Sequence, residues 1–213
     1  MHFISEELEN YVEQHSQNEP ELLVKLFKET HQKILQPRML SGHFQGRVLS
    51  MLSKIIHPKH ILEIGTYTGY AALCLAEGLQ KDGTIDTIDI KEELVSIQEK
   101  YFNLSSWKGQ IIAHLGDALE IIPTLKKKYD LVFIDADKEN YIHYFNMILP
   151  MMSKGGIILS DNVLWSGKVL EELNPKDMST KVLLEYNKMV NNDPRVETVL
   201  LPIRDGLTVS RVL

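Results

Sequence analysis

The stretch Ile61-Leu-Glu-Ile-Gly-Thr-Tyr-Thr-Gly-Tyr70 decides the fold of this chain. An apolar run leads into Gly65, and after Gly69 the residues follow a helical apolar pattern from Ala71 to Ala76. This order predicts a buried strand, a tight glycine turn and the beginning of a helix. In open α/β sheets such a junction borders the crevice beyond the carboxyl ends of the strands, where ligands bind.

Two carboxylates near this junction suggest a ligand rich in hydroxyl groups. Glu63 ends the first apolar strand, where a buried carboxylate is costly unless something satisfies it. Asp89 ends the next predicted strand and could accept hydrogen bonds from ribose hydroxyls. Tyr67 stands where a dinucleotide fingerprint has its second glycine, which argues against a nicotinamide cofactor. Two simpler readings stay open: a turn without a ligand, and Asp89 as a helix cap.

The composition limits the classes of function. The chain has 213 residues, of which 44% are hydrophobic and 24% charged, and this predicts one soluble domain. A formal charge of -6 argues against a nucleic-acid partner. No apolar run approaches the roughly 18 residues of a membrane span. The beginning of the sequence does not resemble a signal peptide, and Cys74 is the single cysteine. We therefore expect a cytoplasmic protein without a membrane partner.

Strands and helices alternate from residue 59 onward. The apolar patterns predict strands at 60–65, 84–90, 110–116, 130–135 and 156–161, with helices near 70–81, 91–103, 118–128 and 139–152. Such alternation indicates a parallel sheet with right-handed crossovers. We expect a helical cap over residues 1–58 and a core over 59–213, within a single domain 1–213.

The last two predicted strands, 196–203 and 206–213, break this alternation. Only Arg204 and Asp205 lie between them, before Gly206 opens the second strand, and so short a link permits a hairpin but no parallel crossover. The sheet should therefore finish with an antiparallel strand.

Oxygen-bearing side chains follow two more of the apolar strands. Asp135 comes after the fourth strand, and Asp161 and Asn162 come after the fifth. Two carboxylates and a carboxamide at one crevice suit Mg²⁺, which takes few protein oxygens and keeps positions for water and substrate. The alternative is that both acids are ordinary strand-end caps. Asp117, with Glu120 three residues later, predicts a helix cap that leaves the Ala118 backbone beside an adenine.

From about Pro37 onward, the chain resembles the metal-dependent O-methyltransferases of the catechol and caffeoyl-coenzyme A type, which use S-adenosylmethionine. The resemblance rests on Glu63-Ile-Gly-Thr-Tyr-Thr-Gly-Tyr70, Asp135-Ala-Asp-Lys-Glu-Asn-Tyr141, Asp161-Asn-Val-Leu-Trp165 and Asp205-Gly-Leu-Thr208. It implies an α/β Rossmann-like methyltransferase fold, with a mostly parallel seven-stranded sheet and an antiparallel C-terminal hairpin strand.

The resemblance also implies roles for individual residues. It assigns the catalytic lysine to Lys138 and an aromatic wall beside the acceptor to Trp165. It assigns a divalent metal, Mg²⁺ or else Ca²⁺ or Mn²⁺, to Asp135, Asp161 and Asn162. Its S-adenosylmethionine contacts correspond to Met39, Ser41, Glu63, Gly65, Tyr67, Asp89, Ala118 and Asp135.

Two departures from the family pattern concern the cofactor and the acceptor. Ala71 replaces a serine that meets the cofactor carboxylate, although backbone amides at the helix start could still receive that group. The plant-type pattern lacks His43 and Phe44, which leaves the acceptor open.

The predicted reaction is methyl transfer to a hydroxyl of a small catechol-like aromatic, or of a caffeoyl-type ester. Lys138 would take or stabilise the charge of the hydroxyl proton. The alternatives are an NAD(P)-dependent oxidoreductase and an inactive cofactor-binding module. Apolar stripes on the N-terminal helices also predict a homodimer.

Overall fold

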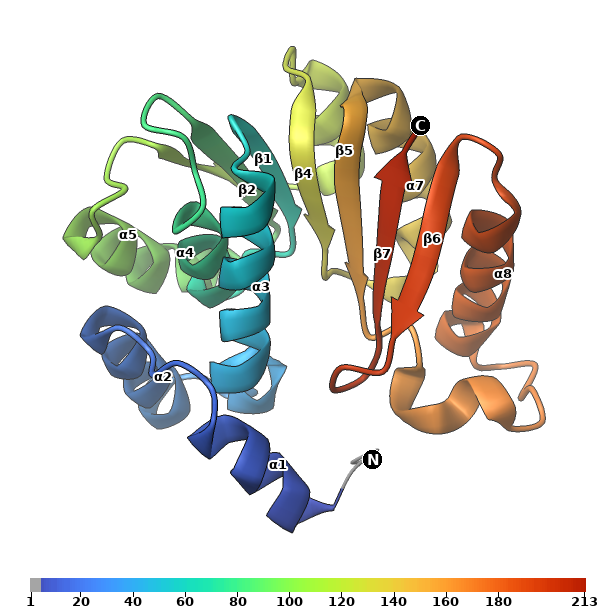
Figure 1. Ribbon diagram of the computed structural model, residues 1–213, viewed down its shortest axis with the longest axis horizontal. Coiled ribbons are helices and arrows are strands. Elements are labelled where there is room, and N and C mark those ends of the chain that lie inside the picture. Colours follow the sequence, from blue (N-terminus) through green and yellow to red (C-terminus); the bar gives the residue numbers. More distant parts are fainter. Residues whose placement is uncertain (1–4) are drawn as a thin grey trace.

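Seven strands form one mixed sheet in the computed structural model, which describes residues 5–213. The strands are β1 (His60–Ile64), β2 (Thr84–Asp89), β3 (Ile111–Leu115), β4 (Tyr129–Ile134), β5 (Met152–Asp161), β6 (Val196–Leu201) and β7 (Leu207–Val212). Their order is β3-β2-β1-β4-β5-β7-β6 (Figure 1). The pairs among β1 to β5 are parallel, whereas β7 runs antiparallel to both β5 and β6. The predicted Rossmann-like sheet with its antiparallel hairpin is confirmed.

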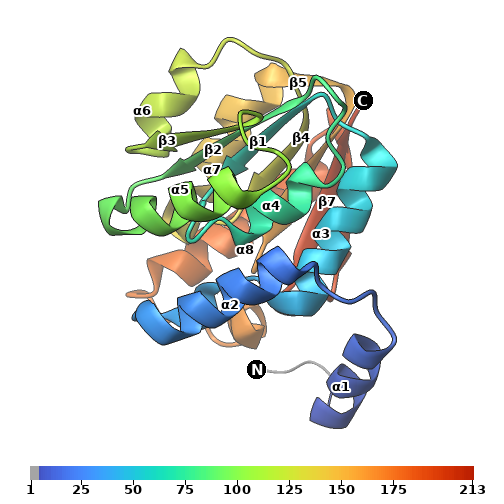
Figure 2. The same ribbon diagram turned by 90° about the vertical axis from the view of Figure 1, so that its left-hand side faces the viewer.

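Helices cover both faces of the sheet because successive strand residues point to opposite sides. Ile61 packs with one group of helices, and Leu62 packs with the other. The first group comprises α2 (Glu21–Lys33), α3 (Gly42–Ile56), α4 (Tyr70–Ala76) and α5 (Val95–Leu104). The second comprises α6 (Ala118–Ile121), α7 (Tyr141–Ile148) and α8 (Met178–Asn192). The N-terminal helix α1 (Glu6–Gln14) has no buried residue and lies at the outer side of these layers, where it contacts α3 (Figure 2).

The glycine turn between β1 and α4 has the backbone conformation that its sequence predicts. Gly65 has φ of 102° and Gly69 has φ of 90°, both in the region that side chains disfavour. A Cβ atom at Gly65 would lie 1.9 Å from the carbonyl oxygen of Asp135. The ends of β1 and β4 can therefore meet only because residue 65 has no side chain.

Three predicted helices are shorter in the structure than the sequence suggested. The first ends at Ala76 instead of residue 81, just before a turn at Gly78. The second is only α6 followed by the 3₁₀ turn η3 (Ile122–Thr124), and the third is α7 followed by η5 (Leu149–Met151). Pro123 and Pro150 lie in those turns, and a proline cannot donate the backbone hydrogen bond of a helix interior. Strand β5 then begins at Met152, four residues earlier than predicted.

Helix α8 was not predicted from the sequence. Its N-cap residue Asp177 accepts a hydrogen bond from the Thr180 amide at 3.0 Å. Leu183, Tyr186 and Val190 are buried along one side of the helix, at the spacing that packs a helix on a sheet. Among the described residues, no helix combines the length and apolar composition needed to cross a bilayer.

A buried ion pair joins the helical cap to the core. The Arg47 guanidinium on α3 lies 2.7 Å from the Glu77 carboxylate after α4, and each side chain is 8% exposed. Ser50 and Lys54 also donate hydrogen bonds to Glu77. Burial raises the pKa of Glu77, but the hydrogen bonds from these three residues outweigh it and hold that pKa below its usual value. Glu77 is therefore charged at neutral pH.

Candidate functional site

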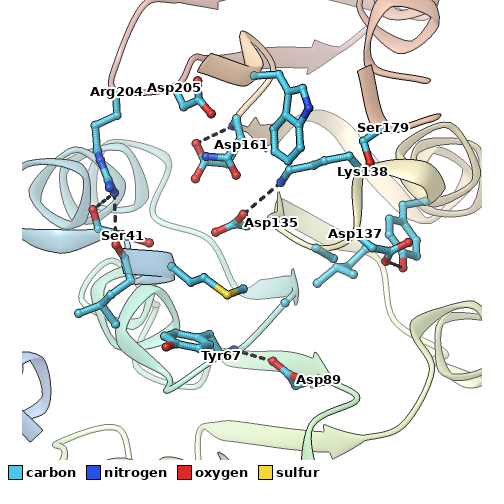
Figure 3. Close-up of a pocket in the computed structure, with 18 of the residues that line it drawn as sticks. Ser41, Tyr67, Asp89, Asp135, Asp137, Lys138, Asp161, Ser179, Arg204 and Asp205 are labelled. Atoms are coloured by element: carbon cyan, nitrogen blue, oxygen red, sulfur yellow. Dashed lines mark hydrogen bonds and ion pairs between the residues drawn. The ribbon is translucent and has the colours of Figure 1, made fainter. Parts of the chain in front are cut away.

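A cavity of about 1540 Å³ opens beyond the carboxyl ends of the parallel strands (Figure 3). The structure brings almost every predicted site residue to its wall, from segments that are distant in sequence. These residues are Met39, Ser41, Gly65, Tyr67, Asp89, Ala118, Asp135, Lys138, Asp161, Asn162 and Trp165.

Asp89 orders the glycine turn and also the start of the following segment. One carboxylate oxygen accepts the Tyr67 amide at 2.6 Å, and the other accepts the Lys91 amide at 2.9 Å. The 3₁₀ helix η2 (Glu92–Leu94) that follows has Lys91 as its N-cap residue and no side-chain cap hydrogen bond. The simpler reading of Asp89 as a helix cap is therefore wrong. A carboxylate has about four lone-pair sites, so Asp89 can still accept hydrogen bonds from a ligand in the cavity.

Glu63 differs from the other predicted site residues because it does not line the cavity. It is fully buried, and the Thr87 hydroxyl donates to its Oε2, while its Oε1 has no partner. Burial raises the pKa of Glu63 well above its usual value, and the negative charges of Asp135 and Asp89 add to this effect. A direct contact between Glu63 and a cofactor stays a prediction.

The first residues of α6 and α4 differ in whether they line the cavity. Asp117 caps α6 as predicted, because its side chain accepts the Leu119 amide at 2.8 Å. Ala118 lies beside it at the cavity wall. Ala71, at the departure from the family pattern, is buried in α4 away from the cavity lining.

Asp135, Asp161 and Asn162 come together where β4 and β5 end. Asp161 is 2% exposed, and burial together with the charge of Asp135 raises its pKa to about 7. Two carboxylates in such a place repel each other, and a cation between them would relieve that repulsion. Within residues 5–213, no three His, Cys, Asp or Glu side chains form a metal-binding group. The candidate set instead contains two carboxylates and one amide, a donor chemistry that fits Mg²⁺.

Lys138 points into the same region from the 3₁₀ helix η4 (Lys138–Asn140). Its side chain is 7% exposed, and Nζ lies 2.5 Å from the Tyr141 hydroxyl and 3.4 Å from an Asp135 oxygen. The Tyr141 hydroxyl donates in turn to the Asp161 carbonyl at 2.9 Å. Burial raises the pKa of Tyr141 well above its usual value, so this hydroxyl stays neutral. The lysine head group is thus held beside the carboxylate pair.

Trp165 forms a wall of the cavity next to Lys138. Its backbone is left-handed, with φ of 49°, and its ring centroid lies 6.0 Å from Lys138 Nζ. The indole Nε1 is buried without a hydrogen-bond partner. The flat ring at this position can pack against an aromatic ligand.

Comparison with known proteins identifies the family. The family model described as O-methyltransferase matches residues 13–213. The chain belongs to the O-methyltransferase family.

Individual members of the O-methyltransferase family support this assignment. The tapetum-specific methyltransferase 1 of Arabidopsis thaliana is 38% identical over 173 residues, which are 78% of this chain and 74% of that protein. The caffeoyl-CoA O-methyltransferase of Medicago sativa is 35% identical over 187 residues, 81% of this chain and 74% of that protein. The SAH-bound Podospora anserina methyltransferase PaMTH1 has a TM-score of 0.89 and 29% identity, covering 99% of this chain and 97% of its own.

This O-methyltransferase has two further residues at the site that were not predicted from the sequence. Gln45 on α3 donates a hydrogen bond to Asp161, and Arg204 in the β6–β7 link donates one to Gln45. Gln45 and Arg204 are 159 residues apart, so no local pattern indicates that they meet. Membership of the family confirms the predicted enzyme class and leaves the oxidoreductase alternative without support.

Proposed function

We propose that this enzyme transfers a methyl group from S-adenosylmethionine to one hydroxyl of a small aromatic with two vicinal hydroxyls. A divalent cation, Mg²⁺ or else Ca²⁺ or Mn²⁺, would be held by Asp135, Asp161 and Asn162. One observation carries the proposal: the carboxylate pair, Lys138 and the glycine turn line a single cavity.

The cofactor would lie along the glycine turn. The turn lacks side chains at residues 65 and 69, which lets a ligand approach the backbone. Asp89 would accept hydrogen bonds from the ribose hydroxyls, and Ala118 would contact the adenine. Met39 and Ser41 also line the cavity and would cover the cofactor.

The residues around the carboxylate pair would prepare the acceptor. A free phenol has a pKa of about 10 and is mostly un-ionised at neutral pH. A bound Mg²⁺ would supply the positive charge that favours ionisation of an acceptor hydroxyl. Lys138 Nζ would accept the hydroxyl proton as a neutral amine, or would stabilise the phenolate oxygen as an ammonium. Trp165 would pack beside the ring. Methyl transfer is a direct displacement, so orientation by these side chains would contribute most of the rate.

A methyl-transfer assay tests the proposal. We expect the purified chain to methylate one of catechol, caffeate and caffeoyl-coenzyme A from S-adenosylmethionine, and to lose this activity with a chelator. Asp161→Ala should abolish transfer but leave S-adenosylmethionine affinity within a few-fold, because Asp161 is assigned to the metal and not to the cofactor. Full activity in excess chelator would contradict the metal assignment.

We also propose that the enzyme is a homodimer. Its location in the cytoplasm stays a prediction. The front face of β6 and β7 in Figure 1, to the right of α3, is not covered by any of the described helices. Val199 on this face is 60% exposed, and Met51 and Ile55 on the outer side of α3 are 57% and 72% exposed. A second copy that covered this face would remove these apolar side chains from water.

A further inference from the structure

Gln45 lies between the Arg204 guanidinium and the Asp161 carboxylate. Its Nε2 donates to Asp161 Oδ2 at 2.6 Å, and its Oε1 accepts from Arg204 Nη1 at 2.7 Å. The Gln45 side chain is 1% exposed and that of Asp161 is buried, so neither is free to turn toward water.

The chemistry of the two neighbours permits only one orientation of the Gln45 amide. A guanidinium has donors and no acceptor, and a carboxylate has acceptors and no donor. The amide oxygen must therefore face Arg204, which obliges the amide nitrogen to face Asp161. The other Asp161 oxygen accepts a hydrogen bond from the backbone amide of Asn162 at 2.8 Å. Both oxygens of this predicted metal ligand are thus oriented by hydrogen bonds.

Arg204 also contacts the segment predicted to cover the cofactor. We define the covering segment as residues 37–42, which include Met39 and Ser41. The Arg204 guanidinium donates to the Ser41 carbonyl oxygen and lies 3.4 Å from the Leu40 carbonyl oxygen (Figure 3). One side chain therefore contacts both the covering segment and, through Gln45, the carboxylate pair.

We propose that Arg204 and Gln45 are positioning residues that orient Asp161 for the cation, and that Arg204 independently holds the covering segment over the cofactor. This inference rests on the proposed function. It predicts that Arg204 affects metal affinity and cofactor affinity through two different contacts. The effect on the metal passes through Gln45, whereas the effect on the cofactor passes through the Ser41 carbonyl.

Binding measurements without catalysis separate the two routes. Metal affinity is measured with Mn²⁺ alone by electron paramagnetic resonance, and cofactor affinity with S-adenosylhomocysteine in chelator by calorimetry. The variants are Arg204→Met, Gln45→Met and the double variant. Loss of a residue that orients a metal ligand typically weakens metal binding roughly 10- to 100-fold.

We expect each single variant to bind Mn²⁺ at least about tenfold more weakly than the wild type. The double variant should bind Mn²⁺ no more weakly than Gln45→Met, because Arg204 acts through Gln45. Arg204→Met should weaken S-adenosylhomocysteine binding to the same degree with or without Gln45. Arg195→Met is the matched control, since Arg195 is exposed and forms an ion pair with Asp193 outside the cavity wall.

Three outcomes would overturn the proposal. Wild-type Mn²⁺ affinity in Arg204→Met would show that Arg204 does not orient Asp161. If the losses of Mn²⁺ affinity in the two single variants add up in the double variant, Arg204 does not act through Gln45. A wild type that binds no Mn²⁺ would overturn the metal site itself and this inference with it. Thermal unfolding of each variant checks folding, and Arg204→Met, altered at an exposed residue, decides the outcome if Gln45→Met fails to fold.

Discussion

Lys138 is unusual among the lysines because its head group is buried in the cavity wall. A lysine near the N-terminus of a helix is disfavoured by the helix dipole, yet here Nζ contacts the Tyr141 hydroxyl and lies near Asp135. Neither the predicted metal ligands nor the cofactor would need this ammonium for binding. We therefore propose that this ammonium serves the acceptor.

We expect Lys138→Met to lower kcat by roughly 10²–10⁴, the scale for a positioned acid–base group. Affinities for Mn²⁺ and S-adenosylhomocysteine should stay near those of the wild type. The loss should be smaller for a nitrocatechol, whose hydroxyl is already acidic. Steady-state kinetics with both acceptors measure this difference.

Lys168→Met is the control, because Lys168 Nζ also lies 6.0 Å from the Trp165 ring but pairs with Asp177. Equal losses for both acceptors would mean that Lys138 positions the ring without assisting ionisation. A wild-type rate in Lys138→Met would remove the residue from the mechanism.

Sequence patterns predicted single residues well where the local chain determines their role. Asp117 is a cap because a helical pattern begins directly after it, and Gly65 is required by the turn that contains it. Glu63 shows the limit, since its position at a strand end did not reveal whether it faces the cavity or the layer below. That depends on Thr87 of the neighbouring strand.

At the scale of elements, the contact between α3 and α4 depends on the charge of Glu77. Burial makes a lone Arg47 costly, so loss of the partner carboxylate should destabilise the protein. We expect Glu77→Gln to lower the free energy of unfolding by about 3 kcal/mol at pH 7. Urea denaturation of the two proteins measures the difference.

The pH dependence of this difference has a definite sign. The folded pKa of Glu77 lies below the usual 4.5, so its stabilisation is fully present above that value and is lost as pH falls through the folded pKa. Wild type and Glu77→Gln should therefore converge in acid. Glu172→Gln, at an exposed residue, should have the same free energy of unfolding as the wild type both at pH 7 and in acid. If the difference in free energy of unfolding between the wild type and Glu77→Gln persists unchanged in acid, the charge of Glu77 is not its cause.

The lengths of elements were harder to predict than their existence. The apolar pattern near 139–152 continues past Pro150, and periodicity alone does not show that the chain leaves the helix and enters β5 there. Helix α8 was missed although its buried residues recur at helical spacing. Strands β4 and β5 were predicted from the continuous apolar runs at 131–134 and 157–159, which are typical of strands covered on both faces.

For the whole molecule, the proposed dimer can be tested at the uncovered face. Ile55→Glu would place a charge within the proposed interface, so we expect a monomer by light scattering where the wild type is a dimer. Leu104→Glu is the control, because Leu104 is 63% exposed at the end of α5, far from β6 (Figure 1). A monomeric wild type would contradict the dimer, and a dimeric Ile55→Glu would move the interface elsewhere.

The parallel strands, the closing hairpin and the carboxylate pair could be predicted because each strand and each strand end is marked locally. The hydrogen bonds among Gln45, Arg204 and Asp161 could not, since three separate segments meet only after the sheet has formed. The part of the cavity that we propose for the acceptor is likewise lined by residues of several segments, among them Lys138, Asp161 and Trp165. Its specificity is therefore a property of the tertiary structure.

The position of β7 between β5 and β6 determines when the site can be completed during synthesis. The strands β1 to β5 have left the ribosome once residue 161 has emerged, but a domain generally folds as a unit and the last two strands of this sheet are still missing. Strand β6 emerges next but pairs only with β7 among the described strands. Because Arg204 lies between them, it reaches Gln45 only when this hairpin docks. A nascent chain paused before residue 207 would hold the glycine turn and both aspartates, but Gln45 would still lack its guanidinium partner.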